Sequence, residues 1–268
     1  MITEVPDAGP GMTQLRSELD RLSLERATGR FGLGHEGAFH LLDGAVTHAE
    51  SVLVPDLGQL LTRSERITEA DWRRIQAHGL PLPPDSPLSQ AELEKFALLG
   101  LFDAAWLLLG SETEPDFTET EPHWLGAANS VTPTTLFHEI ENRRDQLHSV
   151  WPSPLADDAP VVPIRRIRRQ RLILTGIQAE LLVNADGRLT PAELARELGR
   201  TRYGCTLAVR GLVASELVEA PQNPPGVPAP QRWIGGAPRT VRNQTGTRWA
   251  EVDLGLLHRL HDALKELE

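Results

Sequence analysis

An arginine-rich run in the middle of the chain carries side chains suited to bind phosphate groups. Arg165, Arg166, Arg168, Arg169 and Arg171 fall within seven positions. Guanidinium groups pair with phosphate oxygens and give affinity without sequence information. The same run also suits a solvated linker or a contact with an acidic protein surface. Its composition leaves these interpretations open.

Motifs typical of catalysis or metal binding fail on their context. Gly32-Leu33-Gly34-His35-Glu36-Gly37 matches G-x-G-x-x-G, but a strand rather than a helix is expected after it, so it predicts a hairpin turn instead of a dinucleotide site. None of the nine histidines forms His-Glu-x-x-His or a cluster at fixed spacing, and His258 and His261 are expected at the surface or in packing. The acidic pair Asp157-Asp158 lies in a Pro-rich linker. The sequence predicts no enzyme, metal site or cofactor.

The single cysteine, Cys205, excludes an internal disulfide framework and favours a reducing compartment, the cytoplasm. It falls on an apolar helix face, so a structural use is expected. No apolar run approaches the roughly 20 residues that span a bilayer. Residues 1–11 lack the basic and apolar regions of a secretion signal. Arginine outnumbers lysine 25 to 2, which suggests a GC-rich bacterial genome.

Charge is divided unevenly along the chain. Residues 1–160 carry 11 Lys/Arg and 26 Asp/Glu, whereas residues 161–250 carry 14 and 6. A basic segment beside an acidic one is what a regulator with one DNA-facing half would show, because attraction to phosphate is local. The acidic half could equally dock on the basic half of the same chain. Charge alone does not separate these two interpretations.

Residues 174–218 show the signals of three short helices. Thr175-Gly176-Ile177-Gln178 and Thr190-Pro191-Ala192-Glu193 both fit the capping box, and the proline takes the N1 position, where its missing N–H costs nothing. The second helix is expected to end at Gly199, where a positive φ is easily reached. The third helix buries one face at i, i+4, i+7 and i+8, formed by Cys205, Val209, Leu212 and Val213.

A strand-like 217–219, a proline-rich loop at 221–230 and a returning 231–234 complete this pattern as a plausible wing. The segment resembles the winged helix-turn-helix domains of bacterial transcription regulators, notably in Glu193-Leu194-Ala195-Arg196-Glu197-Leu198-Gly199 and Leu212-Val213-Ala214-Ser215-Glu216-Leu217-Val218. The resemblance implies that the outer face of the third helix enters the major groove of DNA. The candidate DNA-binding residues are Arg165, Arg166, Arg168, Arg169, Arg200, Thr201, Arg202, Tyr203, Thr206, Arg210 and Arg232. The alternative is a winged helix that contacts only protein.

The N-terminal 150 residues show a helix, a strand meander and then further helices. A helix is expected over 12–24, before strands at 27–33, 38–42 and 45–49 that glycine-containing turns separate. The later helices are expected over 55–61, 68–78, 89–109 and 132–149, with an acidic, solvated segment at 112–122. Thr68 caps one of these helices and Gly79 ends it.

Three motifs in this part resemble the PATAN domain of bacterial signalling proteins. They are Thr28-Gly29-Arg30-Phe31, Leu42-Asp43-Gly44-Ala45-Val46-Thr47-His48-Ala49 and Phe137-His138-Glu139-Ile140-Glu141-Asn142-Arg143-Arg144-Asp145. After the second motif, Ser51-Val52-Leu53-Val54-Pro55 replaces the usual glycine-rich helix entry. The resemblance implies a non-catalytic interaction or sensing module.

The last expected helix, at 248–268, carries an apolar seam at spacings of three and four. The seam contains Trp249, Val252, Leu256, Leu260 and Ala263. This helix either packs on its own chain or forms a homodimer, which would duplicate the third helix on a palindromic site.

Together these features predict an α+β protein. Its parts are a PATAN-like domain at 1–150 with a small sheet and helices, a Pro/Arg-rich linker at 151–172, a winged helix at 173–235 and a terminal helix. The leading hypothesis is a bacterial cytoplasmic transcription regulator that binds double-stranded DNA and takes a protein or signal input through the acidic N-terminal domain. The alternative is a non-catalytic signalling adaptor whose winged helix contacts protein. No membrane partner is expected.

Overall fold

The glycine-bounded strands near the N-terminus fold as the predicted meander in the computed structural model, which describes residues 10–126, 128–167 and 171–221. β1 (Gly29–Leu33), β2 (Gly37–Leu42) and β3 (Ala45–Ser51) pair antiparallel. Asp43 and Gly44 take positive φ values of 50° and 79° in the tight turn between β2 and β3. The glycine motif at 32–37 joins β1 to β2 and is a hairpin turn, as predicted.

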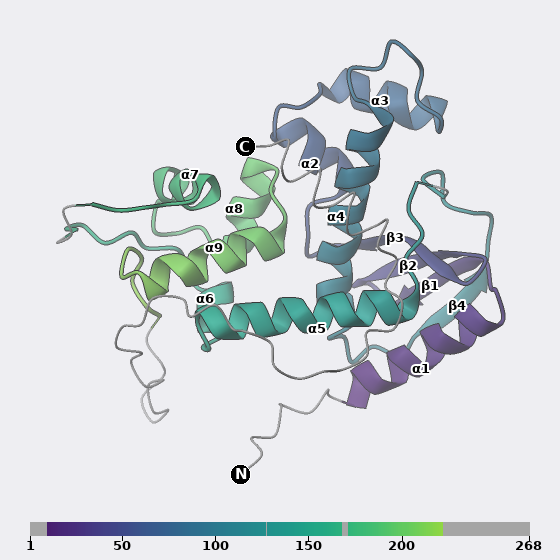
Figure 1. Ribbon diagram of the computed structural model, residues 1–268, viewed down its shortest axis with the longest axis horizontal. Helices are drawn as coiled ribbons and strands as arrows, with labels where there is room; N and C mark the ends of the chain where they lie inside the picture. Colours follow the sequence, from purple (N-terminus) through teal and green to yellow (C-terminus); the bar gives the residue numbers. More distant parts are fainter. Residues whose placement is uncertain (1–9, 127, 168–170, 222–268) are drawn as a thin grey trace, which may run out of the picture. The chain divides into compact units, whose positions relative to one another are not determined.

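A fourth strand comes from the segment that was expected to be solvated. β4 (Asp116–Glu119) pairs antiparallel with β1 and gives the strand order β3-β2-β1-β4 (Figure 1). This strand was not predicted from the sequence, although three of its four residues are exposed, as expected for the segment. Only Phe117 of β4 is even partly buried, so the strand lacks the alternation that would mark it in the sequence. Its exposed acidic side chains suit a sheet edge.

The helices begin at the caps that the sequence indicates. In chain order they are α1 (Pro10–Leu24), α2 (Leu57–Arg63), α3 (Glu69–His78), α4 (Gln90–Leu108), α5 (Pro133–Val150), α6 (Leu155–Asp158), α7 (Gly176–Asn184), α8 (Pro191–Leu198) and α9 (Arg202–Ala214). Capping boxes open five of them, at Asp56, Thr68, Ser89, Thr175 and Thr190. The two boxes predicted near α7 and α8 are thus confirmed.

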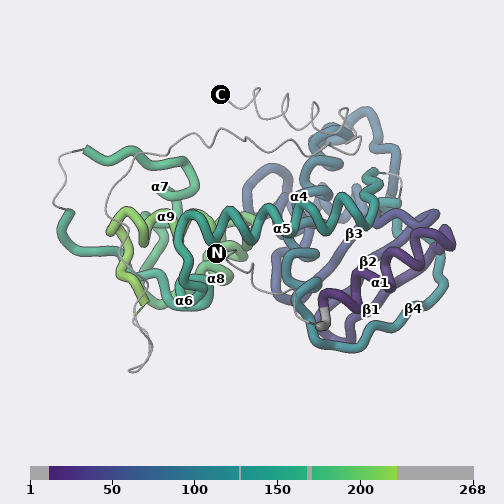
Figure 2. Tube along the Cα trace, turned by 60° about the horizontal axis from the view of Figure 1, so that its bottom comes forward, coloured from purple at the N-terminus to yellow at the C-terminus, as the bar shows by residue number. Residues whose placement is uncertain are grey.

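α4 and α5 connect the sheet to the C-terminal helices. α4 packs on β3, α2, α5 and α9, and its buried residues point in all directions around its axis, as expected of an interior helix. α5 reaches from α9 at one end to α1 at the other, in both views (Figures 1 and 2). The charged side chain that α4 buries is Asp103. The predicted mixed α/β class is confirmed at this level. No helix in the described ranges is long and apolar enough to cross a membrane.

The segment after α5 belongs to the same core as α7, α8 and α9. Ala156 and Val161 are buried in the hydrophobic cluster that these helices form, and Trp151 packs against it. Pro163 bridges Val218 in antiparallel fashion. The stretch 151–163, which the sequence analysis assigns to a linker, thus supplies residues to this core. Residues 222–235, which would complete the wing, lie outside the described residues.

Candidate functional site: α9 and its acidic partners

α9, the helix that the winged-helix resemblance assigns to the major groove, is covered on all sides. Every residue from Arg202 to Val213 is buried or partly buried, and Ala214 alone in this helix is exposed. One face packs on α7 and α8, and other parts of the helix contact α4, α5 and α6. The buried apolar face was predicted and is confirmed. The exposed polar face was also predicted, and that prediction is wrong.

Asp103 of α4 binds the N-terminus of α9. Its two carboxylate oxygens accept the backbone N–H groups of Arg202 and Tyr203, each at 2.7 Å, and the side chain is fully buried. The hydroxyl of Thr201 accepts the N–H of Gly204 at the same helix end. The first N–H groups of a helix lack partners within it and attract anions. A carboxylate of the same chain therefore binds the anion-attracting end of this helix.

Burial raises the pKa of the Asp103 carboxyl from its ordinary 3.8 to about 6. The N–H groups of Tyr203 and Arg202, and the positive charge of Arg143, act in the opposite direction. Desolvation is the larger effect because no water surrounds the group. The contact between α4 and α9 thus contains a carboxyl whose protonation changes near neutral pH.

Tyr203 forms an aromatic and cationic stack with side chains of α4 and α5. The guanidinium carbon of Arg143 lies 4.5 Å from the Tyr203 ring centre and 5.3 Å from that of Phe102. Trp106 meets Tyr203 edge-on, with ring centres 5.6 Å apart. The tyrosine hydroxyl lies 2.6 Å from the side-chain oxygen of Gln146, to which it donates. Such cation–π contacts are strongest where the cation is desolvated, so this stack helps to hold α9 against α4 and α5.

Two neighbouring aspartates of α6 bind the arginines of α9. Arg210 donates to both oxygens of Asp157, at 2.7 and 2.5 Å, and to the carbonyl of Trp151 at 2.7 Å. Arg202 donates to Asp158 at 2.9 Å. The side chains of Arg210 and Asp157 are 7% and 16% exposed, so this pair is largely desolvated, whereas Asp158 is 79% exposed and its pair with Arg202 is open to solvent. The sequence analysis had placed the aspartates in a linker and missed this role.

The remaining predicted DNA-binding residues are scattered. Arg200 pairs with Glu180 of α7 at 2.9 Å, and Thr206 is fully buried. Arg165 and Arg166 are exposed and form no ion pair with another described residue. The predicted residues that lie outside the described part are Arg168, Arg169, Arg232, His258, His261 and the seam residues Trp249, Val252, Leu256, Leu260 and Ala263.

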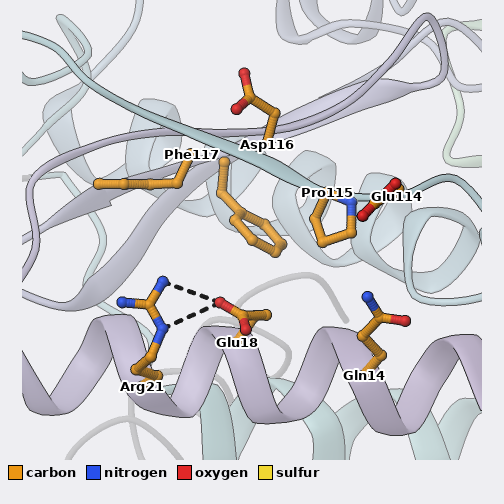
Figure 3. Close-up of a pocket in the computed structure, with 8 residues that line it drawn as sticks. Gln14, Glu18, Arg21, Glu114, Pro115, Asp116 and Phe117 are labelled. Atoms are coloured by element: carbon orange, nitrogen blue, oxygen red, sulfur yellow. Dashed lines mark hydrogen bonds and ion pairs between the residues drawn. The ribbon is translucent and has the colours of Figure 1, made fainter.

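A cleft between α1 and β4 carries an acidic and aromatic lining (Figure 3). Glu18 in this cleft accepts hydrogen bonds from Arg21, at 3.1 and 2.9 Å, and Arg21 also donates to Glu25. The residues that line it are Gln14, Glu18, Arg21, Phe31, Glu114, Pro115, Asp116 and Phe117. Elsewhere, burial raises the pKa of the Cys205 thiol to about 12, which agrees with the predicted structural use. The described part of the chain holds no group of three or more His, Cys, Asp or Glu that could bind a metal ion.

The contacts of α9 are therefore the main guide to function. The likenesses to the PATAN domain and to the winged helix rest on the sequence motifs alone. No model of a protein family matches the chain, and neither the curated proteins nor the solved structures give a match.

Proposed function

We propose that the protein is a non-catalytic signalling adaptor whose C-terminal helices contact protein rather than duplex DNA. The burial of α9 carries this proposal. A helix that reads the major groove needs a free face whose side chains reach base edges. α9 offers no such face, because Arg202 and Arg210 are bound to Asp158 and Asp157.

The division of charge along the chain supports the same conclusion. Residues that precede position 160 supply Asp103, Asp157 and Asp158, which all bind the basic helix α9. Asp103 thus joins the acidic N-terminal part to α9, which supports the intramolecular explanation of the charge pattern. A partner would meet the surface that these contacts leave free. That surface includes the exposed arginines Arg165 and Arg166, which suit an acidic protein.

The same exposed arginines favour a second candidate, the transcription regulator. Arg165, Arg166 and Arg171 are all exposed and could follow a phosphate backbone. Such binding would be weakly dependent on sequence, since phosphate contacts carry no sequence information directly. Sequence-specific binding through α9 would require this helix to leave Asp103.

Selection of genomic DNA separates the two candidates. The purified full-length protein is incubated with fragmented DNA of its source at near-physiological salt, and the retained fragments are sequenced. The adaptor proposal expects no discrete enriched sites. Discrete sites that disappear in folded Arg202→Ala or Arg210→Ala variants would contradict it. The Arg165→Ala/Arg166→Ala variant is the matched surface control, and it should lose only salt-sensitive, unspecific retention.

A site-specific crosslink provides the positive test. A photoreactive amino acid replaces Arg166 in the full-length protein, and the same replacement at the exposed Arg73 of α3 serves as control. The adaptor proposal expects one discrete protein adduct from position 166 alone. The adduct should disappear when Arg165 is changed to Glu. Adducts to DNA alone from position 166 would support the regulator instead.

A further inference from the structure

Three histidines that lie far apart in the sequence meet on the sheet. His40 of β2 and His48 of β3 are paired in register, with ring centres 5.7 Å apart. His123, which follows β4, stacks on His48 with ring centres 4.3 Å apart and planes 7° from parallel. Its ring centre also lies 4.8 Å from that of His40. We propose that this histidine cluster is a proton-sensitive latch: when the imidazoles take up protons, residues 120–126 leave the sheet.

The hydrogen bonds of the cluster suit neutral rings. Nδ1 of His123 accepts the backbone N–H of Leu125 at 3.4 Å, so it carries no proton in the closed arrangement. Nδ1 of His48 is buried and has no hydrogen-bond partner, and Nε2 of His40 is buried with a Glu50 carboxylate oxygen 3.5 Å away. A protonated imidazole has two N–H donors, and burying an unpaired donor on a cation is unfavourable. Proton uptake therefore weakens the closed arrangement at His48 and His123.

The charged groups around the cluster can balance one proton but not three. Glu50 of β3 lies 3.5 Å from Nε2 of His40, and Arg30 of β1 lies 3.6 Å from the same carboxylate oxygen. These two, with the histidines themselves, are the charged groups that act on the cluster. Two imidazolium rings at stacking distance would repel each other, and a single carboxylate shared with an arginine cannot offset both.

The acidities of the groups agree with this geometry. Burial is the main cause that lowers the pKa of His48 to about 3 and that of His123 to about 4, and the neighbouring imidazoles add to it. His40 is the main cause that lowers the pKa of Glu50 to about 2. Released imidazoles return to an ordinary value near 6.5. Opening is therefore coupled to proton uptake as the pH falls below that value.

Release of this segment would uncover apolar side chains. Trp124 follows His123 directly and meets Trp72 of α3 edge-on, with ring centres 5.8 Å apart. Leu125 is buried in the hydrophobic cluster that α2, α3 and the start of α4 share. Acid would thus present Trp72 and its neighbours to solvent or to a partner.

Amide hydrogen exchange of the full-length protein between pH 7.5 and 5.0 tests the latch. After correction for intrinsic exchange, we expect protection of residues 120–126 to fall by more than about tenfold per pH unit below pH 6.5, because more than one proton is taken up. Residues 202–214 should keep their protection. An unchanged 120–126 segment would overturn the proposal. Simultaneous loss of protection in both segments would also overturn it, since that is global acid unfolding.

Variants identify the responsible rings. The His48→Phe/His123→Phe variant keeps two stacked rings that cannot be protonated, and its 120–126 segment should change by less than about threefold over the same range. If that variant does not fold, His123→Phe alone should remove about one factor of ten per pH unit. His78→Phe, on the exposed side of α3, should behave as the unsubstituted protein. A normal acid response in the double variant, or opening by a chelator at pH 7.5, would contradict a proton latch.

Discussion

Buried carboxylates decide what α9 contacts. Asp103 accepts the backbone N–H of Arg202, 99 positions later, and Asp157 binds the guanidinium of Arg210, 53 positions later, so both contacts form only when distant parts of the chain come together. The Arg210–Asp157 ion pair is largely desolvated and carries two hydrogen bonds, the condition under which breaking an ion pair is most damaging. The intact pair adds little net stability of its own, because a matched apolar pair can fill such a site.

A double-mutant cycle measures how much the interaction between Arg210 and Asp157 contributes to stability. Arg210→Met leaves the aspartate buried and unpaired, and we expect it to lower the free energy of unfolding by roughly 3–5 kcal/mol. Asp157→Leu should act similarly. The double variant should recover most of the loss, as measured by urea unfolding followed by circular dichroism. Equal and additive losses would show that the two side chains do not interact.

The carboxyl of Asp103 should give the stability a particular pH dependence. Its folded pKa of about 6 lies above the ordinary 3.8, so the folded state holds the proton more tightly, and stability falls as the pH rises through this window. A shift of this size corresponds to about 3 kcal/mol. The stability of the protein relative to Asp103→Asn should therefore decrease by about that amount from pH 4 to pH 7. A relative stability that increases with pH would show that α9 prefers the ionised carboxylate. Asp85→Asn, at an exposed position, is the control.

At the scale of elements, local signals predicted the helices and turns well. Thr68 and Gly79 bound α3 as expected, and the capping boxes place the starts of α7 and α8 correctly, because a cap depends only on residues three positions apart. β4 was missed because pairing with β1, not its own pattern, makes it a strand. The outer face of α9 was misjudged for a similar reason. Its partners come from elements that the sequence does not place beside it.

The spacing of histidines along the chain does not reveal the histidine cluster. His40 and His48 face each other through the register of β2 and β3, and the third ring arrives from a segment more than 70 positions later. Strand pairing of this kind can be anticipated from the turn at Asp43 and Gly44, but the position of His123 cannot. Of the predicted DNA-binding residues on α9, Arg202 and Arg210 bind aspartate side chains of the same chain.

The end of α8 forms a close contact that can be measured. Gly199 has a φ of 61°, and a Cβ there would lie 2.5 Å from the backbone nitrogen of Ser64 after α2. Gly79 also has positive φ, at 76°, but has open space around it. We expect Gly79→Ala to lower the free energy of unfolding by roughly 1–3 kcal/mol, because a φ of 76° with a ψ of −163° suits glycine alone. Gly199→Ala should lower it by roughly 1–2 kcal/mol through its left-handed conformation and by roughly 1–3 kcal/mol more through the backbone contact. Equal losses of stability in thermal or urea unfolding would show that the backbone at Ser64 can shift to accommodate the added Cβ without further loss.

At the scale of the whole molecule, the described residues form one compact unit. α9 completes its hydrogen bonds with α4 and α6, and its only tyrosine, Tyr203, stacks on Arg143 of α5. Pairs that join distant residues slow folding, because the chain must close long loops before they form. Division of the chain near residue 150 would separate α9 from Asp103 and Arg143, which it contacts.

Separate expression of residues 1–150 and residues 151–268 tests whether the two fragments fold independently. We expect the 151–268 fragment to bind a hydrophobic dye and to unfold without a cooperative transition, because α9 has lost Asp103, Arg143 and Gln146. Mixing it with the 1–150 fragment should restore a cooperative transition. The intact chain is the reference. Two fragments that each unfold cooperatively would establish independent domains and would make release of α9 far easier.

The rings of Tyr203 and Trp106 have an optical consequence. The chain contains one tyrosine, and its ring centre lies 5.6 Å from an indole. At that separation, light absorbed by the phenol passes to the tryptophan, so tyrosine emission is quenched while α9 rests on α4. An event that separates these two helices and moves the phenol away from the other five tryptophans brings the missing emission back. The protein thus carries its own fluorescent gauge of that contact, which reports in solution without any attached dye.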